Sequence, residues 1–153
     1  MADTEKPKDN YFTPRGNVLK RWTQIHLWIY RRTGGRLLYK MRKMPTVLLT
    51  TTGRKSGLAR TVPLPYLREG GDPVVVGSFA GNARDPAWVL NLRSEPNVTV
   101  QDRADVYQAT AQVLAGDERA GVWQRLVAQS PWYADYQKQT ERQIPLVRLV
   151  RNG

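Results

Sequence analysis

The first regular pattern along the chain is helical and covers residues 16–32. Apolar side chains recur there at spacings of three and four residues: Val18, Trp22, Ile25 and Ile29. Such spacing places them on one narrow face of a helix, and Gln24 and Arg31 on the opposite face. Gly34 ends this helix. Residues 36–43 are expected to add one or two short basic helical turns before Pro45.

The next segment has the pattern of a β-hairpin. Residues 46–52, TVLLTTT, are rich in β-branched side chains and predict a strand. The Gly-bounded sequence GRKSG at residues 53–57 connects it to a returning strand over residues 58–67. Pro63 and Pro65 lack the backbone N–H that a ladder needs, so this second strand should lie at a sheet edge or carry a bulge there.

Turn signals at close intervals divide the rest of the chain into short elements. Strands are expected at residues 74–79, 97–101, 106–114 and 146–150, and helices at residues 86–93, 117–129 and 131–139. Asp85 and Asp117 are expected to cap the first two of these helices. About six short strands interrupted by small helices predict a partly closed antiparallel β-barrel of the α+β class. The chain then divides into a tail with a basic amphipathic segment, residues 1–44, and a barrel domain, residues 45–153.

Composition limits the chemistry. The chain has 153 residues, no Cys and a single histidine, His26. These counts indicate one domain and exclude disulfides, thiolate nucleophiles and Cys-ligated zinc, and no metal site is predicted. The N-terminal residues have no apolar core of a signal peptide, and no apolar run approaches the roughly 18 residues of a membrane span. We therefore expect a cytoplasmic protein.

The positive charge is concentrated in one part of the chain. The formal net charge is +11, and residues 11–68 contain thirteen basic residues and no acidic one. This block predicts a polarised surface that faces an anionic partner: nucleic acid, lipid headgroups or a phosphorylated small molecule. A basic surface that serves solubility alone is the alternative.

The GRKSG connection is a candidate anion site. It offers Arg54, Lys55 and the Ser56 hydroxyl on a turn bounded by Gly57, and Arg60 follows on the outgoing strand. Phosphate groups are bound by charged donors and by uncrowded backbone N–H groups, and this loop supplies both. It lacks the spacing and the following helix of a nucleotide P-loop. An ordinary exposed hairpin with solvated charges is the alternative.

Two further clusters combine aromatic and polar side chains. Trp88 and Asn91 lie three residues apart on one helical face, where they can address a flat heterocycle or belong to the core. Tyr133 and Tyr136 share a face in the sequence SPWYADY, where they can cover an aromatic substrate or close the barrel end. Ser78 follows a Val-rich strand and is either a turn residue or a polar contact.

Three separated segments together resemble the deazaflavin-dependent nitroreductase family, actinobacterial proteins that use coenzyme F420. They are TVLLTTTGRKSGLARTVPL, GSFAGNARDPAWVLNL and SPWYADYQKQTERQIPLV, and they occur in the order that the family has. The resemblance covers roughly residues 45–150. It implies a split β-barrel related to flavin reductases and pyridoxamine-phosphate oxidases. It also implies hydride transfer from reduced F420 to a quinone, enone or nitroaromatic acceptor.

The resemblance also assigns roles by position. It implies that the phosphate and anionic tail of the cofactor bind Arg54, Lys55, Ser56, Gly57 and Arg60. Its ring would be framed by Thr61, Val62, Pro63, Gly77, Ser78, Phe79, Trp88, Asn91 and Tyr133. The acceptor would contact Pro65, Ser130, Trp132, Tyr133 and Tyr136, with Ser78, Tyr133 and Tyr136 as catalytic residues. Phe79 stands where relatives often have Lys, and Ser130 where an aromatic can occur, so we expect a differently shaped acceptor pocket.

Several alternatives stay open from the sequence. The apolar stripe of the N-terminal helix has two interpretations. It can bring residues 16–43 into contact with an anionic membrane, at the inner face of the cell membrane, or it can pack on the barrel. The protein could be a non-enzymatic basic module that carries the cofactor or binds polyanions, or a split-barrel reductase that binds FMN. The basic block has no pattern of a specific nucleic-acid reader, and a monomer is favoured.

Overall fold

The computed structural model describes residues 16–153 except residue 38, and the side chains from residue 21 onward. The polar tail lies outside the described residues, and so does the side chain of Val18 in the predicted helix. The helices are α1 (Gly16–Thr33), α2 (Ala87–Ser94), α3 (Gly116–Gln129) and α4 (Trp132–Lys138), with a short 3-10 turn at Phe79–Gly81. The strands are β1 (Lys40–Met41), β2 (Met44–Thr52), β3 (Ala59–Glu69), β4 (Asp72–Val76), β5 (Asn97–Asp102), β6 (Asp105–Val113) and β7 (Leu146–Arg151).

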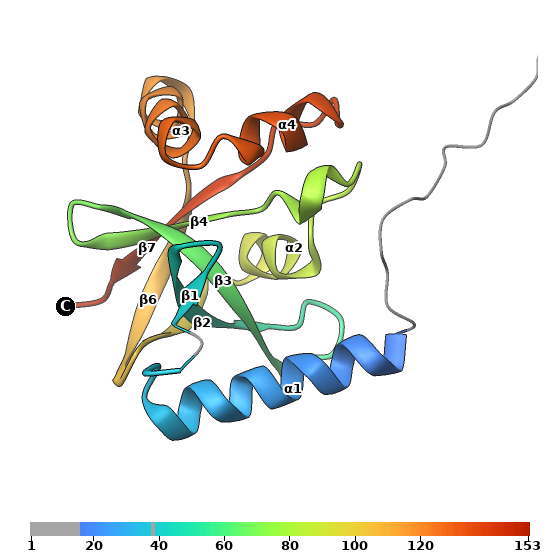
Figure 1. Ribbon diagram of the computed structural model, residues 1–153, viewed down its shortest axis with the longest axis vertical. Coiled ribbons are helices and arrows are strands. Elements are labelled where there is room, and N and C mark those ends of the chain that lie inside the picture. Colours follow the sequence, from blue (N-terminus) through green and yellow to red (C-terminus); the bar gives the residue numbers. More distant parts are fainter. Residues whose placement is uncertain (1–15, 38) are drawn as a thin grey trace, which may run out of the picture.

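The strands form one antiparallel sheet that closes on itself (Figure 1). Neighbouring strands follow the order β1-β2-β3-β4-β7-β6-β5, and β2 also pairs with β5 through Leu48 and Gln101. Strands β2 to β7 therefore make a six-stranded barrel, which confirms the predicted split-barrel architecture, and β1 adds a short seventh strand. Closure of the barrel pairs most of the strand edges that would otherwise be open to other chains.

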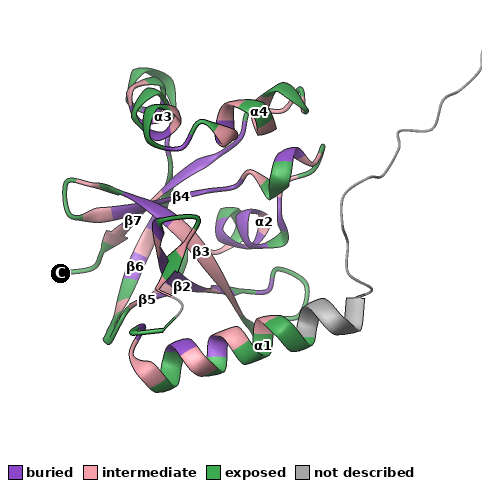
Figure 2. Cartoon of the chain, in the orientation of Figure 1, coloured by how far each residue is buried: buried purple, intermediate pink, exposed green. Residues whose placement is uncertain are grey.

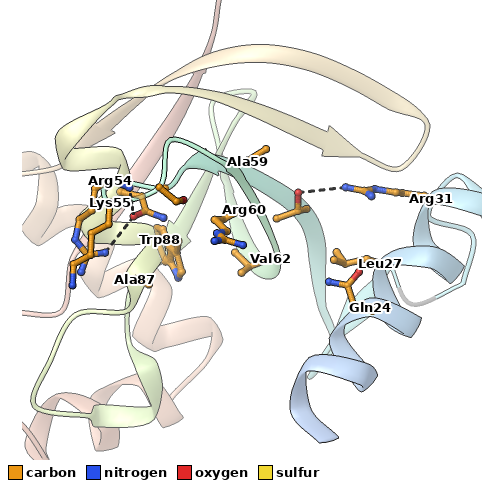
Figure 3. Close-up of a pocket in the computed structure, with 14 residues that line it drawn as sticks. Gln24, Leu27, Arg31, Arg54, Lys55, Ala59, Arg60, Val62, Ala87 and Trp88 are labelled. Carbon is orange, nitrogen blue, oxygen red and sulfur yellow. Dashed lines mark hydrogen bonds between the residues drawn. The ribbon is translucent and has the colours of Figure 1, made fainter. Parts of the chain in front are cut away.

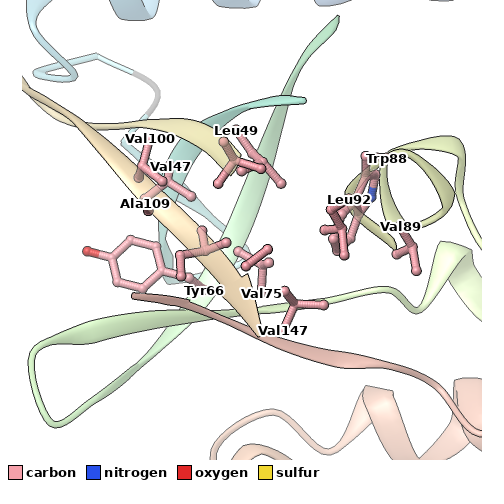
Figure 4. Close-up of a cluster of buried hydrophobic side chains, with 13 residues drawn as sticks. Val47, Leu49, Tyr66, Val75, Trp88, Val89, Leu92, Val100, Ala109 and Val147 are labelled. Carbon is pink, nitrogen blue, oxygen red and sulfur yellow. The ribbon is translucent and has the colours of Figure 1, made fainter. Parts of the chain in front are cut away.

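The core lies inside the barrel and under α2 (Figure 4). Alternate residues of the strands point inward, as the two-residue period of a strand requires, and Val47, Leu49 and Val75 are fully buried. Trp88 and Leu92 of α2 belong to the same cluster. A second buried cluster joins the sheet to α3 and α4, which lie at the end of the molecule opposite α1 in this view (Figure 1).

Strand β3 has one side open along its first half. Residues 59–65 pair only with β2, because the pairing with β4 begins at Tyr66 opposite Val75. Pro63 and Pro65 lie in this half, opposite Leu48 and Thr46 of β2, so the predicted edge position of the two prolines is confirmed.

Helix α1 packs on the barrel through a different face from the predicted apolar stripe (Figure 2). Leu27 and Tyr30 are buried, and the Tyr30 hydroxyl donates to the Thr46 carbonyl oxygen at 2.8 Å. Trp22 is 66% exposed and Ile25 is 47% exposed. The interpretation in which that stripe packs on the barrel is therefore wrong.

Three local predictions are also wrong. Residues 40–44 form a tight hairpin of β1 and β2 and not further helical turns, because Met41 pairs directly with Met44. Asp85 does not cap α2, since its carboxylate forms ion pairs with Arg93 at 2.7 Å and Arg142 at 2.8 Å. Helix α3 begins at residue 116, so Asp117 lies in its first turn and not at the cap. Among the described residues, no helix has the length and apolarity to cross a bilayer.

Candidate functional site

A cavity of about 530 Å³ opens between the GRKSG loop, the first half of β3, α2 and α1 (Figure 3). Its lining comprises Gln24, Leu27, Arg31, Gly53, Arg54, Lys55, Ser56, Ala59, Arg60, Thr61, Val62, Ala87, Trp88 and Asn91. The close-up places Arg54 and Lys55 at one side, Arg60 near the centre, and the α1 residue Arg31 at the other side. The open side of β3 thus forms the floor of this cavity.

The loop that carries the cations is compact. Gly57 donates from its N–H to the Gly53 carbonyl oxygen at 2.8 Å and has a φ of 70°, a conformation that glycine adopts without strain. A Cβ atom on Gly53 would lie 2.7 Å from the Ser56 hydroxyl oxygen and 3.2 Å from the Leu58 carbonyl oxygen, so a larger residue there would displace contacts of the loop. The Ser56 hydroxyl accepts from the Leu58 N–H at 3.2 Å. These contacts hold the side chains of the loop toward the cavity.

Asn91 of α2 fixes the first residue of the loop. Its Oδ1 accepts from the Arg54 backbone N–H at 3.1 Å and from Arg54 Nη1 at 3.3 Å. Its Nδ2 donates to the Thr51 hydroxyl at 3.1 Å, and the residue is only 4% exposed. The amide is therefore engaged by the protein and acts chiefly by positioning Arg54.

The cavity carries positive charge without a counter-charge. Its described lining contains Arg31, Arg54, Lys55 and Arg60, and none of these lining residues is acidic. The ion pairs of the described residues all use arginines from Arg68 onward. Unpaired cations around a concave surface attract an anionic ligand, so the cavity fits a molecule with phosphate or carboxylate groups.

A second cavity of about 230 Å³ lies where the β1–β2 hairpin, β3 and α4 meet. It is lined by Met41, Arg42, Met44, Pro65, Ser78, Ala80, Trp132, Tyr133 and Tyr136. The rings of Tyr133 and Tyr136 meet edge to face, with centroids 6.0 Å apart. Aromatic walls with a few polar groups are typical of a site for a small flat molecule.

The polar residues of the second cavity, Tyr133, Tyr136 and Ser78, have different contacts with the rest of the protein. Burial raises the pKa of Tyr133 to about 12, so this phenol stays protonated at neutral pH, and its hydroxyl faces the Met44 sulfur at 3.9 Å. The Tyr136 hydroxyl accepts from Arg42 Nη1 at 2.9 Å. The Ser78 carbonyl oxygen accepts from Arg142 Nη2 at 2.8 Å, while the residue lines the cavity.

Strand β3 connects the two cavities. Val62 lines the first and Pro65 the second, and three residues of strand span about 10 Å. An elongated ligand with an anionic tail and a flat ring can therefore hold its tail in the first cavity and direct its ring toward the second.

Most of the candidate residues from the sequence line one of the two cavities. The exceptions are Gly57, Pro63, Gly77, Phe79 and Ser130. Gly77 is a packing position, because a Cβ there would lie 2.6 Å from the Pro145 ring. Phe79 is 54% exposed, and Ser130 is fully buried with its hydroxyl 3.4 Å from the Met44 sulfur.

Sequence analysis missed part of both linings. Gln24, Leu27 and Arg31 of α1 line the first cavity, and their spacing of three and four residues was a signal that they share a face. Arg42 and Met44 line the second cavity, and no sequence pattern pointed to them, because their partners on α4 are about ninety residues away.

The sequence is similar to a known protein family along most of its length. Residues 22–151 match the sequence profile of the F420H(2)-dependent quinone reductase family. An F420H(2)-dependent quinone reductase of Mycobacterium tuberculosis is 34% identical over 132 residues, which cover 84% of this chain and 89% of that protein.

Two solved structures share the fold and much of the sequence. An F420-H2 dependent reductase, FDR-A, is 42% identical, with a TM-score of 0.63 over 69% of this chain and 93% of that one. A structure described as a domain-swapped dimer is 36% identical, with a TM-score of 0.66 over 87% of this chain and 97% of that one.

Proposed function

The chain belongs to the F420H(2)-dependent quinone reductase family, and on this premise we propose that it reduces a quinone with a hydride from reduced coenzyme F420. The observation that carries the proposal is the pair of cavities along β3, one cationic and one aromatic. F420 has a phosphate and an anionic tail, and the unpaired cations of the first cavity fit these groups. When bound, the reduced cofactor supplies the hydride.

Each cavity has its own task in this proposal. Arg54, Lys55 and Arg60 hold the phosphate and tail, and Arg31 of α1 completes the ring of positive charge around the first cavity. Thr61, Val62, Pro63 and Trp88 border the ring of the cofactor. This arrangement positions the reacting groups, which is the main contribution a protein makes to cofactor chemistry.

The second cavity receives the acceptor. Pro65 and the aromatic residues of α4 hold a flat ring. The hydroxyl groups of Ser78, Tyr133 and Tyr136 are the candidate proton donors. A phenol is protonated at neutral pH and can donate, but burial, which raises the pKa of Tyr133 to about 12, makes it a weaker acid than an unperturbed tyrosine. Enones and nitroaromatics, which also accept a hydride, are further candidate acceptors.

We expect the purified protein to bind oxidised F420 saturably and FMN weakly or not at all. FMN has a phosphate but no anionic tail, so it can engage only part of the cation ring in the first cavity. The measurement is a fluorescence titration at roughly 0.15 M salt, where loose electrostatic attraction is screened. Preferential binding of FMN would assign the chain to the flavin-binding branch of the fold, and binding of neither would favour a basic module without a cofactor.

We further propose that the exposed face of α1 holds the enzyme on an anionic membrane at the cytoplasmic side, where lipid-soluble quinones reside. Trp22, Ile25 and Trp28 are 66%, 47% and 61% exposed and lie on the face that turns away from the barrel. Arg21 and Arg32 flank them and are also exposed. Aromatic and aliphatic side chains beside arginines are typical of helices that lie in the interface of anionic bilayers.

Substitution of Trp22, Ile25 and Trp28 by Ser should reduce binding to anionic liposomes about tenfold or more, because the apolar area that enters the interface is lost. Cosedimentation of the full chain with phosphatidylglycerol-containing vesicles measures this. A Val106→Ser, Val113→Ser variant removes exposed apolar side chains from β6 and should bind as the wild type does. Equal binding by all three proteins would exclude α1 as the membrane contact.

A further inference from the structure

The tip of the β1–β2 hairpin places a cation at the second cavity. Met41 and Met44 form a pair, so Arg42 and Lys43 make a two-residue turn, with φ angles of 47° and 65°. Turns of this kind usually contain Asn and Gly, since a Cβ atom disfavours positive φ angles. Backbone strain of this kind often marks a functional site.

Two aromatic residues of α4 hold the Arg42 side chain in place. Its Nη1 donates to the Tyr136 hydroxyl at 2.9 Å, and its guanidinium carbon lies 5.6 Å from the centre of the Trp132 ring. Within the described part of the chain, no carboxylate forms an ion pair with Arg42. The charge of Arg42 is thus fixed at the cavity and is not neutralised by the protein.

The reduction of a quinone creates a need for such a charge. A hydride brings two electrons and one proton, so the reduced quinone carries a negative oxygen until a second proton arrives. Arg42 is the only cation in the described lining of the second cavity, and that lining has no Asp, Glu or His. A fixed cation next to the oxygen on which negative charge develops stabilises the transition state of quinone reduction.

We propose that Arg42 is the anion-stabilising residue of the acceptor cavity, and that the charged oxygen of the reduced quinone binds between its guanidinium and the Tyr136 hydroxyl. This inference rests on the proposed quinone reductase function and names a further catalytic residue for it. Because the Tyr136 oxygen accepts from Arg42, the O–H proton of Tyr136 is free for donation to the quinone oxygen. The tyrosinate that remains is stabilised by Arg42 and regains a proton from solvent, which reaches both residues.

The inference also predicts which quinones bind best. An acceptor with an ionised hydroxyl group on its ring already carries the charge that Arg42 attracts. Hydroxyquinones should therefore bind the second cavity more tightly than neutral quinones of the same size, and Arg42 should account for the difference.

The first test needs no cofactor. Binding of lawsone, a hydroxynaphthoquinone that is anionic at neutral pH, and of menadione, a neutral methylnaphthoquinone, is measured by quenching of tryptophan fluorescence. Arg42→Gln should weaken lawsone binding about tenfold and change menadione binding less than about twofold, whereas Arg42→Lys should keep most of the preference. Lys138→Gln removes one exposed charge from the same helix, α4, and should change neither affinity.

The second test uses the reduced cofactor. In a single turnover with menadione, Arg42→Gln should slow oxidation of reduced F420 at least tenfold, with unchanged affinity for F420. The proposal is overturned if both quinones lose affinity equally, if Arg42→Gln binds lawsone like the wild type, or if the wild type binds neither probe. Failure of F420 to bind the wild type would instead contradict the proposed function, and the cofactor-free comparison would still decide the role of Arg42.

Discussion

Substitution of Lys55 and Arg60 together by Ala is expected to weaken F420 binding about a hundredfold and to leave the barrel folded. Both side chains line the first cavity, and among the described residues neither forms a hydrogen bond or an ion pair with the protein. Their charge is therefore available to the ligand, and a hydrogen bond to a charged group contributes roughly 1.5–3 kcal/mol. Fluorescence titration with F420 measures the loss of affinity.

The control for this variant is a second double substitution with the same change in net charge. Arg125 is an exposed residue of α3 whose only described ion pair is with Glu69, and Lys138 is exposed on α4. Substitution of both by Ala should leave F420 affinity within about twofold of the wild type at roughly 0.15 M salt. Equal losses in the two variants would mean that net charge alone attracts the cofactor, and no loss in the first would remove the GRKSG loop from the site.

Arg142→Ala is expected to lower the free energy of unfolding by about 2–4 kcal/mol and to impair the acceptor cavity. The Arg142 side chain is only 15% exposed. It donates to three backbone carbonyl oxygens, those of Gly77, Ser78 and Asn82, at 3.1, 2.8 and 2.8 Å. It also pairs with Asp85 at 2.8 Å. Its removal leaves these acceptors without their charged donor.

The segment that Arg142 holds is strained. Phe79 and Ala80 have φ angles of 45° and 51°, and the exposed Phe79 ring cannot stabilise that conformation by packing. Because Ser78 and Ala80 line the second cavity, the KM for the quinone should rise more than the Kd for F420. Urea denaturation and steady-state kinetics measure the two effects.

Two further variants separate this role from a general loss of charge. Arg142→Lys keeps the charge but not the planar fork of donors, so it should restore only part of the stability. Lys138→Ala, at an exposed residue that forms no ion pair among the described residues, should leave the denaturation midpoint unchanged. A stability and a quinone KM like those of the wild type in Arg142→Ala would show that other contacts hold the Gly77–Asn82 segment.

The sequence was most informative where local pattern and tertiary structure agree. The β-branched run at residues 46–52, the Gly-bounded loop at residues 53–57 and the two prolines of β3 predicted a hairpin with an open edge. That edge became the floor of the first cavity, and the cations of the loop lie around it. Charge distribution and hairpin signals therefore indicated a candidate anion site at this loop, beside the alternative of an exposed hairpin, but they did not predict the cavity itself.

The helical periodicity of α1 did not show which face packs. Trp22 and Ile25 formed the apolar stripe, but the barrel covers Leu27 and Tyr30, because the Tyr30 hydroxyl can bond to the Thr46 carbonyl oxygen and to the Arg103 N–H at 2.7 Å. A buried polar contact of this kind depends on segments far apart in the chain. Periodicity identifies the faces of a helix but not the partner of each face.

The second cavity shows the same limit. Arg42 lies in a segment whose Lys, Arg, Leu and Met residues favour a helix, yet pairing with β2 makes it a hairpin. Its contact with Tyr136 joins residues 94 positions apart. Arg142 likewise reaches a segment about sixty residues earlier. Arg42 belongs to no motif, and nothing in the SPWYADYQKQTERQIPLV segment distinguished Arg142 from its neighbours, so only the tertiary structure reveals how they shape the site.

The most direct test of the central claim is a single-turnover measurement of hydride transfer. Reduced F420 is mixed with the protein and menadione without oxygen, and the absorbance of the oxidised cofactor is followed. We predict oxidation that is much faster than without protein and that saturates with quinone concentration. If bound reduced F420 is oxidised no faster than in the absence of the protein, the assignment of this protein as a quinone reductase is contradicted.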